Sequence, residues 1–388
     1  MSFLDKPQPL WWRKALFQIH LWVGLFAGLY AIVIGISGSI LVFKQELAAL
    51  TYPHLMRAPN PDRPERADLF TVMVRARTAY PDFRLSGGYL PGVGSDNVLV
   101  YMQGDGGREL FVMADPSDGH LLGALDIESS WLHWVSDLHI HLLLGLPGYV
   151  VNAIGAGLLL LLSLTGLVLW WPGIRRWPQA LIVDFRRSWR RINFDLHSAA
   201  GFYTLAFVVM WSISGINFVF PQQVAAVVNV FSSVEGGREP EIHIKAQRRS
   251  ADLSAVLGQA VRNFPAGRLA GVYLGEDANH PITVFLSRGR RNDFTRMDYV
   301  YFHPESGRQL AVWHSGVNPT LGSTFVFWLS PLHFGVNWGQ GIKTLWALLG
   351  LSLPALAVTG ALMYWNRYLG RRWKRLRSAA AKSEAPVA

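Results

Sequence analysis

Four long apolar stretches constrain the fold of this chain more than any other feature of its sequence. They cover about 16–43, 147–171, 198–220 and 342–365 in a chain of 388 residues that is 51% hydrophobic and only 16% charged. A helix needs roughly 20 apolar residues to cross a bilayer core of about 30 Å, and each stretch supplies them. Because the backbone polar groups of such a segment must be satisfied within it, we expect four membrane-spanning helices.

Basic residues flank one end of all four stretches, and they predict the orientation of the chain. They are Arg13, Lys14, Arg175, Arg176, Arg186, Arg187, Arg190, Arg191, Arg371, Arg372, Lys374, Arg375 and Arg377. Cytoplasmic segments collect Lys and Arg, so we expect 1–15, 172–197 and 366–388 in the cytoplasm and the long loops 44–146 and 221–341 outside. The net charge of +10 is then a feature of topology and does not indicate a nucleic-acid partner.

The chain also repeats itself in separate stretches, each of which matches its counterpart without gaps. His20, Gly24 and Ser37-Gly38 recur as His197, Gly201 and Ser214-Gly215, and the stretch 134–171 recurs as 328–365 with His139 matched by His333. The outer loops match as well, since Ala67-Asp68-Leu69 recurs as Ala251-Asp252-Leu253. A repeat of this length predicts a tandem duplication, in which a span, an outer domain and a second span occur twice.

Each outer loop predicts a small α+β domain. Apolar residues have helical spacing over 67–79 and 251–263, and strand-like runs follow at 98–101, 110–113, 282–285 and 299–302. Asp115–Gly119 and His303–Gly307 have the Pro and Gly of hairpin turns. The aromatic segments 131–145 and 325–339 predict helices at the outer interface. The expected fold is a four-helix transmembrane bundle from a tandem duplication, with two small α+β extracytoplasmic domains.

Only four of the twelve histidines fall at matching positions in both halves: His20, His197, His139 and His333. His20 lies six residues after Lys14, and His197 lies six after Arg191, so both are at the same shallow depth on the inner side. His139 and His333 precede their spans and lie near the outer side. Ionisable residues in or beside spanning helices are costly and are usually functional. The four therefore form an inner pair and an outer pair.

Two neutral imidazoles on facing helices are the ligand set of a six-coordinate b-type haem. We expect two such haems, one held by the inner pair His20 and His197 and one by the outer pair His139 and His333. The chain has no cysteine, which excludes thiolate-ligated clusters, a thiolate haem and haem attached through C-x-x-C-H. A zinc or copper site would need a third or fourth ligand, and the spans offer too few carboxylates for one.

Alternatives remain for several positions. His133 and His141 compete with His139 for the outer site, although Phe327 and Gly335 stand at their matching positions. His314 is placed to contact a substrate. The inner basic residues Arg13, Lys14, Arg190 and Arg191 suit either haem propionates or lipid headgroups.

Small residues occur at the depths of the histidines, as Thr165-Gly166 and Thr359-Gly360 on the inner side and Ser37-Gly38 and Ser214-Gly215 on the outer side. They allow two interpretations: close packing of membrane helices, or clearance for a planar macrocycle.

The chain resembles the PepSY-associated transmembrane family over about residues 12–370. The matching features are the His-x-x-x-Gly openings at His20 and His197, the Leu-His segments at His139 and His333, the Ser/Thr-Gly pairs and the Asp-Pro-x-x-Gly turn. The resemblance implies PepSY-like outer domains and an inner-membrane protein of an iron-regulated system. Some members, of the FoxB type, are reductases that release iron from ferric siderophores using two bound haems. His303 departs from the usual Asp of the turn.

The function expected from these features is transmembrane electron transfer. Electrons from a cytoplasmic or quinol donor would enter near the inner pair, reach the outer pair and reduce a ferric siderophore on the periplasmic side. One alternative is a permease, for which four spans are few and none is expected to be broken at mid-membrane. The other is a membrane-anchored binding or regulatory module without redox activity.

Overall fold

The computed structural model describes residues 10–59, 62–92, 95–235, 239–242, 250–275, 279–289, 293–370 and 373. Its contacts divide the chain into two compact units. The membrane unit comprises Met1–Val42, Ser136–Val224 and Gln340–Ala388, and the sheet unit comprises Phe43–Val135 and Ala225–Gly339. The basic residues Arg371, Arg372, Lys374, Arg375 and Arg377, together with residues 1–9 of the predicted N-terminal segment, lie outside the described residues.

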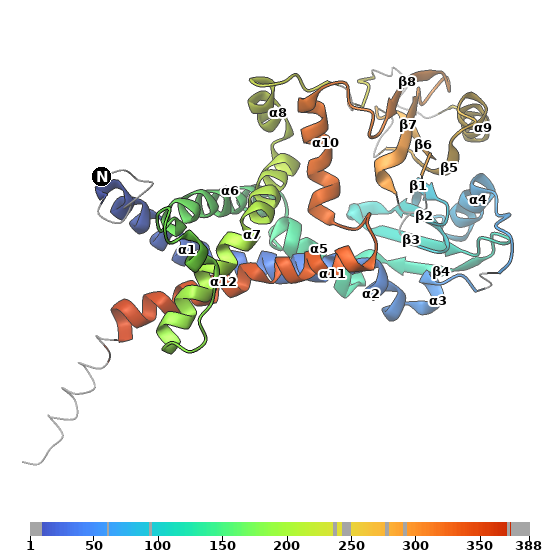
Figure 1. Ribbon diagram of the computed structural model, residues 1–388. Helices are drawn as coiled ribbons and strands as arrows, with labels where there is room; N and C mark the ends of the chain where they lie inside the picture. Colours follow the sequence, from blue (N-terminus) through green and yellow to red (C-terminus); the bar gives the residue numbers. More distant parts are fainter. Residues whose placement is uncertain are drawn as a thin grey trace, which may run out of the picture. The chain divides into compact units, whose positions relative to one another are not determined.

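The membrane unit contains the four predicted apolar helical segments, each long enough to cross a membrane. They are α1 (Trp11–Leu41), α6 (Gly145–Trp170), α7 (Trp189–Val219) and a fourth segment made of α11 (Gln340–Gly350), α12 (Ser352–Tyr364) and the π-helical turn η5 (Trp365–Leu369). In the bundle α1 packs on α6, α6 on α7, α7 on α12 and α12 on α1 (Figure 1). Each helix thus has two neighbours, and the bundle closes on itself.

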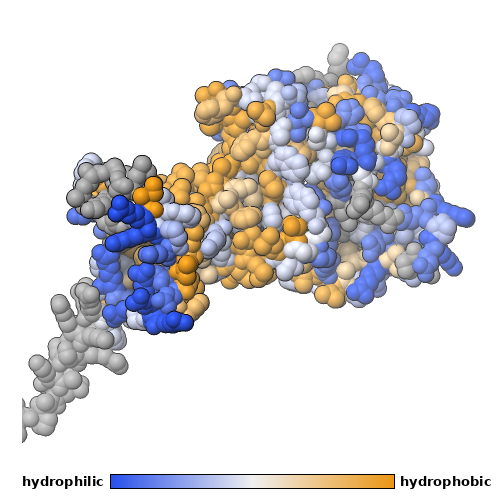
Figure 2. Space-filling model, in the orientation of Figure 1, coloured by the Kyte–Doolittle hydropathy of each residue, from blue (hydrophilic) through white to orange (hydrophobic). Residues whose placement is uncertain are grey.

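Large apolar side chains cover the outside of these helices. Phe26 is 81% exposed, Leu29 72% and Leu348 63%, and Figure 2 shows a continuous apolar surface, in orange, over the helices. Burying a side chain of this size away from water is worth about 1.5–3 kcal/mol. Lipid is therefore the surrounding that this surface requires, as expected for a membrane protein.

Two helical segments differ from the predicted spans. The α7 helix begins at Trp189, before the apolar run at 198, because polar residues continue the helix and Asp195 pairs with Arg191 at 2.9 Å. The fourth segment is interrupted at Leu351, which the sequence did not predict. Pro354 has no N–H to donate to the carbonyl of Gly350, so one hydrogen bond of the helix is missing there. The backbone at Leu351 still has right-handed helical angles, with φ of −67° and ψ of −11°.

The sheet unit contains one eight-stranded antiparallel sheet in the order β4-β3-β2-β1-β5-β6-β7-β8. The strands are β1 (Arg84–Tyr89), β2 (Val98–Gln103), β3 (Glu109–Ala114), β4 (Leu121–Asp126), β5 (Arg268–Tyr273), β6 (Ile282–Ser287), β7 (Met297–Phe302) and β8 (Gln309–His314). All four predicted strand runs are confirmed. The two strand sets, which the sequence assigned to two domains, join through Gly87–Tyr89 of β1 and Gly271–Tyr273 of β5.

Two helices cover one face of the sheet and form its core. They are α4 (Leu69–Ala79) and α9 (Leu253–Asn263), and their apolar sides pack on the buried residues of β2, β3, β6 and β7. Asp68 and Asp252 cap the first turns of these helices, so each helix begins two residues after its predicted start. Both predicted hairpin turns are confirmed. In the second turn His303 Nδ1 accepts from the backbone N–H of Glu305 at 3.2 Å, where the first turn uses a carboxylate.

The aromatic segments before the second and fourth spans are helical, as predicted. They form α5 (Trp131–His141) and α10 (Leu321–Phe334). The remaining short elements are α2 (Lys44–Thr51), α3 (Pro53–Met56), α8 (Pro221–Asn229) and the 3₁₀ turns η1 (Asp105–Gly107), η2 (Ile127–Ser129), η3 (Trp177–Leu181) and η4 (Phe294–Arg296).

Candidate functional site

The hydroxyl of Thr165 fixes the orientation and tautomer of the His20 ring. Thr165 Oγ1 lies 2.7 Å from the carbonyl oxygen of Leu161 on its own helix and donates its proton there. Its oxygen then accepts from Nδ1 of His20, which is 2.9 Å away. The proton of the neutral ring is therefore on Nδ1, and the lone pair on Nε2 is the one that can bind a metal.

The same arrangement recurs at His197. Thr359 Oγ1 donates to the carbonyl oxygen of Ala355 at 2.7 Å and accepts from Nδ1 of His197 at 2.9 Å. Asn193, one turn before His197 and almost completely buried, donates to the backbone oxygen of Thr359 at 2.9 Å. Hydrogen bonds to the hydroxyl and to the backbone oxygen of Thr359 thus join α7 to α12.

The rings of the inner pair lie close together within the membrane unit. Their centroids are 6.5 Å apart and their planes are nearly perpendicular, at 89°. Two imidazoles bonded to one metal from opposite sides, each at about 2 Å, would have ring centres about 6 Å apart. The spacing of His20 and His197 therefore suits two axial ligands of one iron.

In three of the four Ser/Thr-Gly pairs the glycine makes room for an imidazole, whereas a Cβ added at Gly215 would lie 3.3 Å from Cβ of Ala156. A Cβ added at Gly166 would lie 3.2 Å from Cε1 of His20, and one at Gly360 would lie 3.4 Å from Cε1 of His197. At Gly38 the distance to Cε1 of His139 would be 2.9 Å. The sequence left close packing and macrocycle clearance open, and these three glycines are seen to contact the histidine ring itself.

His139, the predicted outer ligand of the first half, has the same partners as the inner histidines. Its Nδ1 lies 2.9 Å from Oγ of Ser37, which donates to the carbonyl oxygen of Val33 at 2.7 Å. Burial lowers the pKa of His139, so its ring is neutral near pH 7. Because Nδ1 donates to Ser37, the ring proton of His139 is on Nδ1 and the lone pair is on Nε2, as in the inner histidines.

His333, the predicted outer ligand of the second half, lies on α10. Its ring packs edge-on against Phe334 with centroids 5.6 Å apart. His139 belongs to the membrane unit and His333 to the sheet unit, so the pairing of these two residues stays a prediction.

The competitors of His139 have different surroundings. His141 Nδ1 pairs with the carboxylate of Asp137 at 2.8 Å, and its ring lies 5.4 Å from that of Tyr149. His133 is half-buried on the preceding turn of α5. Like His20 and His197, His139 has a hydroxyl as the partner of its Nδ1. This common feature favours His139, over His133 and His141, as their equivalent.

Two of the inner basic residues have partners in the protein. Arg13 donates to the carbonyl oxygens of Val168, at 2.8 Å, and Leu169 at the end of α6, and Arg191 pairs with Asp195. His314 donates from Nδ1 to the buried carboxylate of Asp298 at 2.8 Å. For Lys14 and Arg190, haem propionates and lipid headgroups stay the two predicted partners.

Asn152 is a residue that the sequence analysis missed. Its Nδ2 donates to the backbone oxygens of His139, at 2.7 Å, and Ile140, at 2.9 Å. The hydroxyl of Tyr30 in turn donates to Oδ1 of Asn152 at 2.8 Å. This network ties the end of α5 to α1 and α6. An amide in an otherwise apolar helix was the signal that could have identified it.

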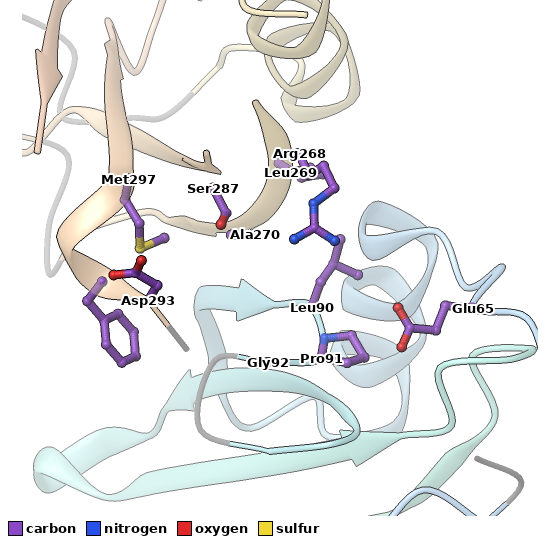
Figure 3. Close-up of a pocket in the computed structure, with 11 residues that line it drawn as sticks. Glu65, Leu90, Pro91, Gly92, Arg268, Leu269, Ala270, Ser287, Asp293 and Met297 are labelled. Atoms are coloured by element: carbon purple, nitrogen blue, oxygen red, sulfur yellow. The ribbon is translucent and has the colours of Figure 1, made fainter. Parts of the chain in front are cut away.

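A small cavity of about 180 Å³ lies in the sheet unit beside β5 (Figure 3). The guanidinium of Arg268 extends into it, with the carboxylates of Glu65 and Asp293 on either side. Arg268 also donates to the backbone oxygen of Gly289 at 3.1 Å. Among the described residues no three His, Asp or Glu side chains gather as ligands for a bare metal ion.

The fold and these sites define a membrane protein of four spanning helices with an antiparallel sheet unit carried on its long loops. The chain belongs to the family described as the PepSY-associated TM region, whose model matches residues 17–367. It is also similar to the uncharacterized protein PA4219 of Pseudomonas aeruginosa, with 26% identity over 260 residues. That match covers 60% of this chain and 62% of the relative, less than two thirds of its length.

Proposed function

We propose that this protein is a ferric-siderophore reductase of the bacterial inner membrane, in which two b-type haems carry electrons to the periplasmic side. His20 and His197 would hold one haem, and His139 and His333 the other. The observation that carries the proposal is the common setting of three histidines. In each, Nδ1 donates to a hydroxyl whose own proton is engaged by its helix, so that Nε2 remains for iron.

The proposal extends to a tandem duplication of the chain. The helices α4 and α9, and the strands β1 and β5, have equal lengths and matching positions in the two halves, which supports it. Each half would then supply one ligand to each haem. Ser214, the repeat counterpart of Ser37, donates from Oγ to the carbonyl oxygen of Met210 at 2.9 Å, as the other hydroxyls do to their own helices.

The proposed orientation places both termini in the cytoplasm and the sheet unit in the periplasm. The inner ends of α1, α6 and α7 lie next to Arg13, Arg175, Arg176, Arg190 and Arg191, and the positive-inside rule assigns these ends to the cytoplasm. The inner pair would then lie near the electron donor, which is a cytoplasmic reductant or a quinol. The outer pair would lie near the ferric chelate.

The chemistry needed is the transfer of one electron per iron. Bound haem supplies one-electron chemistry between its ferric and ferrous states. The hydroxyls of Thr165, Thr359 and Ser37 would hold the rings of His20, His197 and His139 in one orientation and one tautomer. The electron that leaves the donor reduces substrate Fe(III) to Fe(II), which binds hard oxygen ligands more weakly and so dissociates from the siderophore.

The proposal is tested by the reaction itself. Purified protein is reduced without oxygen, mixed with a ferric trihydroxamate, and followed by its haem absorption while a ferrous chelator traps the product. We expect reoxidation of the haem in step with Fe(II) release, and loss of both in His139→Ala. Protein that is purified intact without a reducible haem spectrum would contradict the proposal. Uptake of labelled chelate by vesicles that contain haem-free protein would favour a permease instead.

A further inference from the structure

Two indole N–H groups at the inner end of α6 are buried without a hydrogen-bond acceptor. Nε1 of Trp170 and Nε1 of Trp171 are both shielded from solvent, and neither has an acceptor among the residues that the structure describes. An indole nitrogen can only donate, and a buried one usually finds an acceptor because an unmet donor costs free energy. Two such donors on adjacent residues therefore point to a ligand that supplies acceptors.

Trp170 lies next to the contact between α6 and His20. It follows Gly166 by four residues, so the two share one side of the helix. Gly166 is the residue whose added Cβ would lie 3.2 Å from Cε1 of His20. Side chains of a helix lean toward its N-terminus, so the indole of Trp170 lies over the turn that contains Gly166. The first of the two donors is therefore about one turn from a predicted iron ligand.

Ring contacts hold both indoles within the membrane unit. Trp170 stacks on Phe202 of α7, with centroids 4.1 Å apart and planes at 23°, and the ring of Trp171 lies 6.3 Å from that of Trp170. Trp171 ends α6, because its ψ of 111° turns the backbone out of the helix. The two donors are thus kept in place by packing and are not free to turn toward water.

A guanidinium lies at the same end of α6. Arg13 donates to the carbonyl oxygens of Val168, at 2.8 Å, and Leu169, the two residues that precede Trp170. A guanidinium has five N–H groups, so these two bonds leave others for a further acceptor. Arg13 stands seven residues before His20 on α1, which is about two turns along nearly the same side of the helix. A positive charge and two neutral donors therefore gather on the inner side of His20.

The ligand that this set of donors fits is a carboxylate. Haem carries two propionates, which are ionised near pH 7 and are costly to bury unless N–H donors or a cation surround them. Hydrogen bonds to an ionised carboxylate are roughly twice as strong as those between neutral groups. The indoles supply donors, and Arg13 supplies the charge. The inner end of α6 therefore fits the charged edge of a haem bound by His20 and His197.

The second half of the chain does not repeat this set of donors. Trp365 stands at the position that matches Trp171, and it is 49% exposed. Arg190, which matches Arg13, is exposed as well. The two inner histidines have matching positions, but their surroundings differ in charge and in buried donors. A haem between them would therefore have one preferred orientation, and the second half offers matched control positions.

We propose that Trp170, Trp171 and Arg13 form a carboxylate site for the propionates of the inner haem. The charged edge of the macrocycle then faces the side on which α1 meets α6, at the end of the bundle where electrons would enter. The indoles bind the propionates as neutral donors, and the guanidinium offsets their charge. This inference rests on the inner haem of the proposed function and names the residues that orient it.

The test compares haem with its dimethyl ester, in which both carboxylates are blocked and neutral. The parent protein is the full-length chain with His139→Ala, which removes an outer ligand. It is purified from haem-deficient cells and titrated with each compound by absorption. We expect the parent to bind haem at least about tenfold more tightly than the ester. Trp170→Phe and Trp171→Phe keep a ring and remove the N–H, so each should weaken haem binding about tenfold and ester binding much less.

Trp365→Phe and Arg190→Met are the matched controls, and both are expected to bind haem as tightly as the parent. Equal affinity of the parent for haem and ester would overturn the assignment. Equal weakening of both compounds by Trp170→Phe and Trp171→Phe would also overturn it, because a packing role affects them alike. Unchanged haem affinity in these two variants would assign the indoles to another acceptor, such as a lipid phosphate.

The outcomes separate this inference from the reductase. Wild-type protein that reduces a ferric trihydroxamate, while the parent binds haem and ester equally, would contradict the propionate site alone. Selective haem binding by a protein that reduces no ferric chelate would contradict the reductase and leave the propionate site standing. Intact protein that binds no haem would contradict both.

Discussion

The inner and outer histidine pairs differ in how the fold assembles them. His20 and His197 both belong to the membrane unit, on helices that close into one bundle, and their ring centroids are 6.5 Å apart. The outer pair draws His139 from the membrane unit and His333 from the sheet unit. The members of the inner pair are therefore brought together within one packed unit, whereas His139 and His333 lie in different units and their pairing stays a prediction.

This difference suggests a division of labour under the proposed function. A site built inside one bundle is suited to a fixed role, such as receiving electrons. The sheet unit, which carries His333, would instead serve the ferric chelate. The following changes test whether the two sites are independent.

The largest expected effect comes from filling the space beside His20. Gly166→Val would place methyl groups where the glycine now lies against Cε1 of His20, so the ring must leave its position. We expect almost complete loss of the inner haem, with the outer haem retained, by difference absorption spectra. Gly157→Val on the same helix is the control, because a Cβ there meets no atom within 4 Å. Equal spectra for the two variants would contradict the assigned role of Gly166.

Removing a hydroxyl should have a smaller effect on the same site. Thr165→Val keeps the volume but removes the acceptor of the His20 Nδ1 proton, and such changes weaken metal binding about 10–100-fold. A less basic ligand also stabilises Fe(III) less, so we expect a higher midpoint potential for the inner haem alone. Potentiometric titration checks this, with Thr165→Ser restoring the wild-type value.

Ser163→Ala is the matched control for the Thr165 change. Ser163 is buried on the same helix, and its hydroxyl donates to the carbonyl oxygen of Leu159 at 2.9 Å. A shift as large in Ser163→Ala as in Thr165→Val would show that helix packing, rather than the imidazole contact, sets the potential.

The smallest expected effects come from the two buried amides. Asn152→Leu leaves the backbone oxygens of His139 and Ile140 without their donor, at a cost of about 1–3 kcal/mol. We expect a few-fold loss of outer haem with the inner haem unchanged. Asn193→Leu, at the matching inner network, should do the opposite. Haem content measured at increasing detergent exposure compares the two variants, and the same pattern in both would argue against separate sites.

Much of the fold follows from patterns that act over short distances. Apolar runs predicted the four spans, because a bilayer rewards length and hydrophobicity alone. The spacing of apolar residues predicted α4 and α9, but not the caps at Asp68 and Asp252 that set their first residues. The union of both strand sets was missed, since pairing between β1 and β5 depends on residues 184 positions apart that carry no local signal.

The sequence identified the candidate histidine ligands, but not the residues that hydrogen-bond to them. The sequence repeat singled out His20, His197, His139 and His333, because these histidines occur at matching positions in both halves. It also drew attention to Thr165, Thr359 and Ser37, without revealing that each accepts from an imidazole. Asn152 and Asn193 escaped notice because neither recurs in the other half, so the repeat could not select them.

The most direct test of the two-site account is the number of haems that each histidine variant binds. Haem and protein are quantified in purified wild type, His20→Ala, His139→Ala and the double variant. The account predicts about two haems per chain in the wild type, about one in each single variant and almost none in the double variant. A wild type without haem, or single variants that keep the full complement, would contradict it.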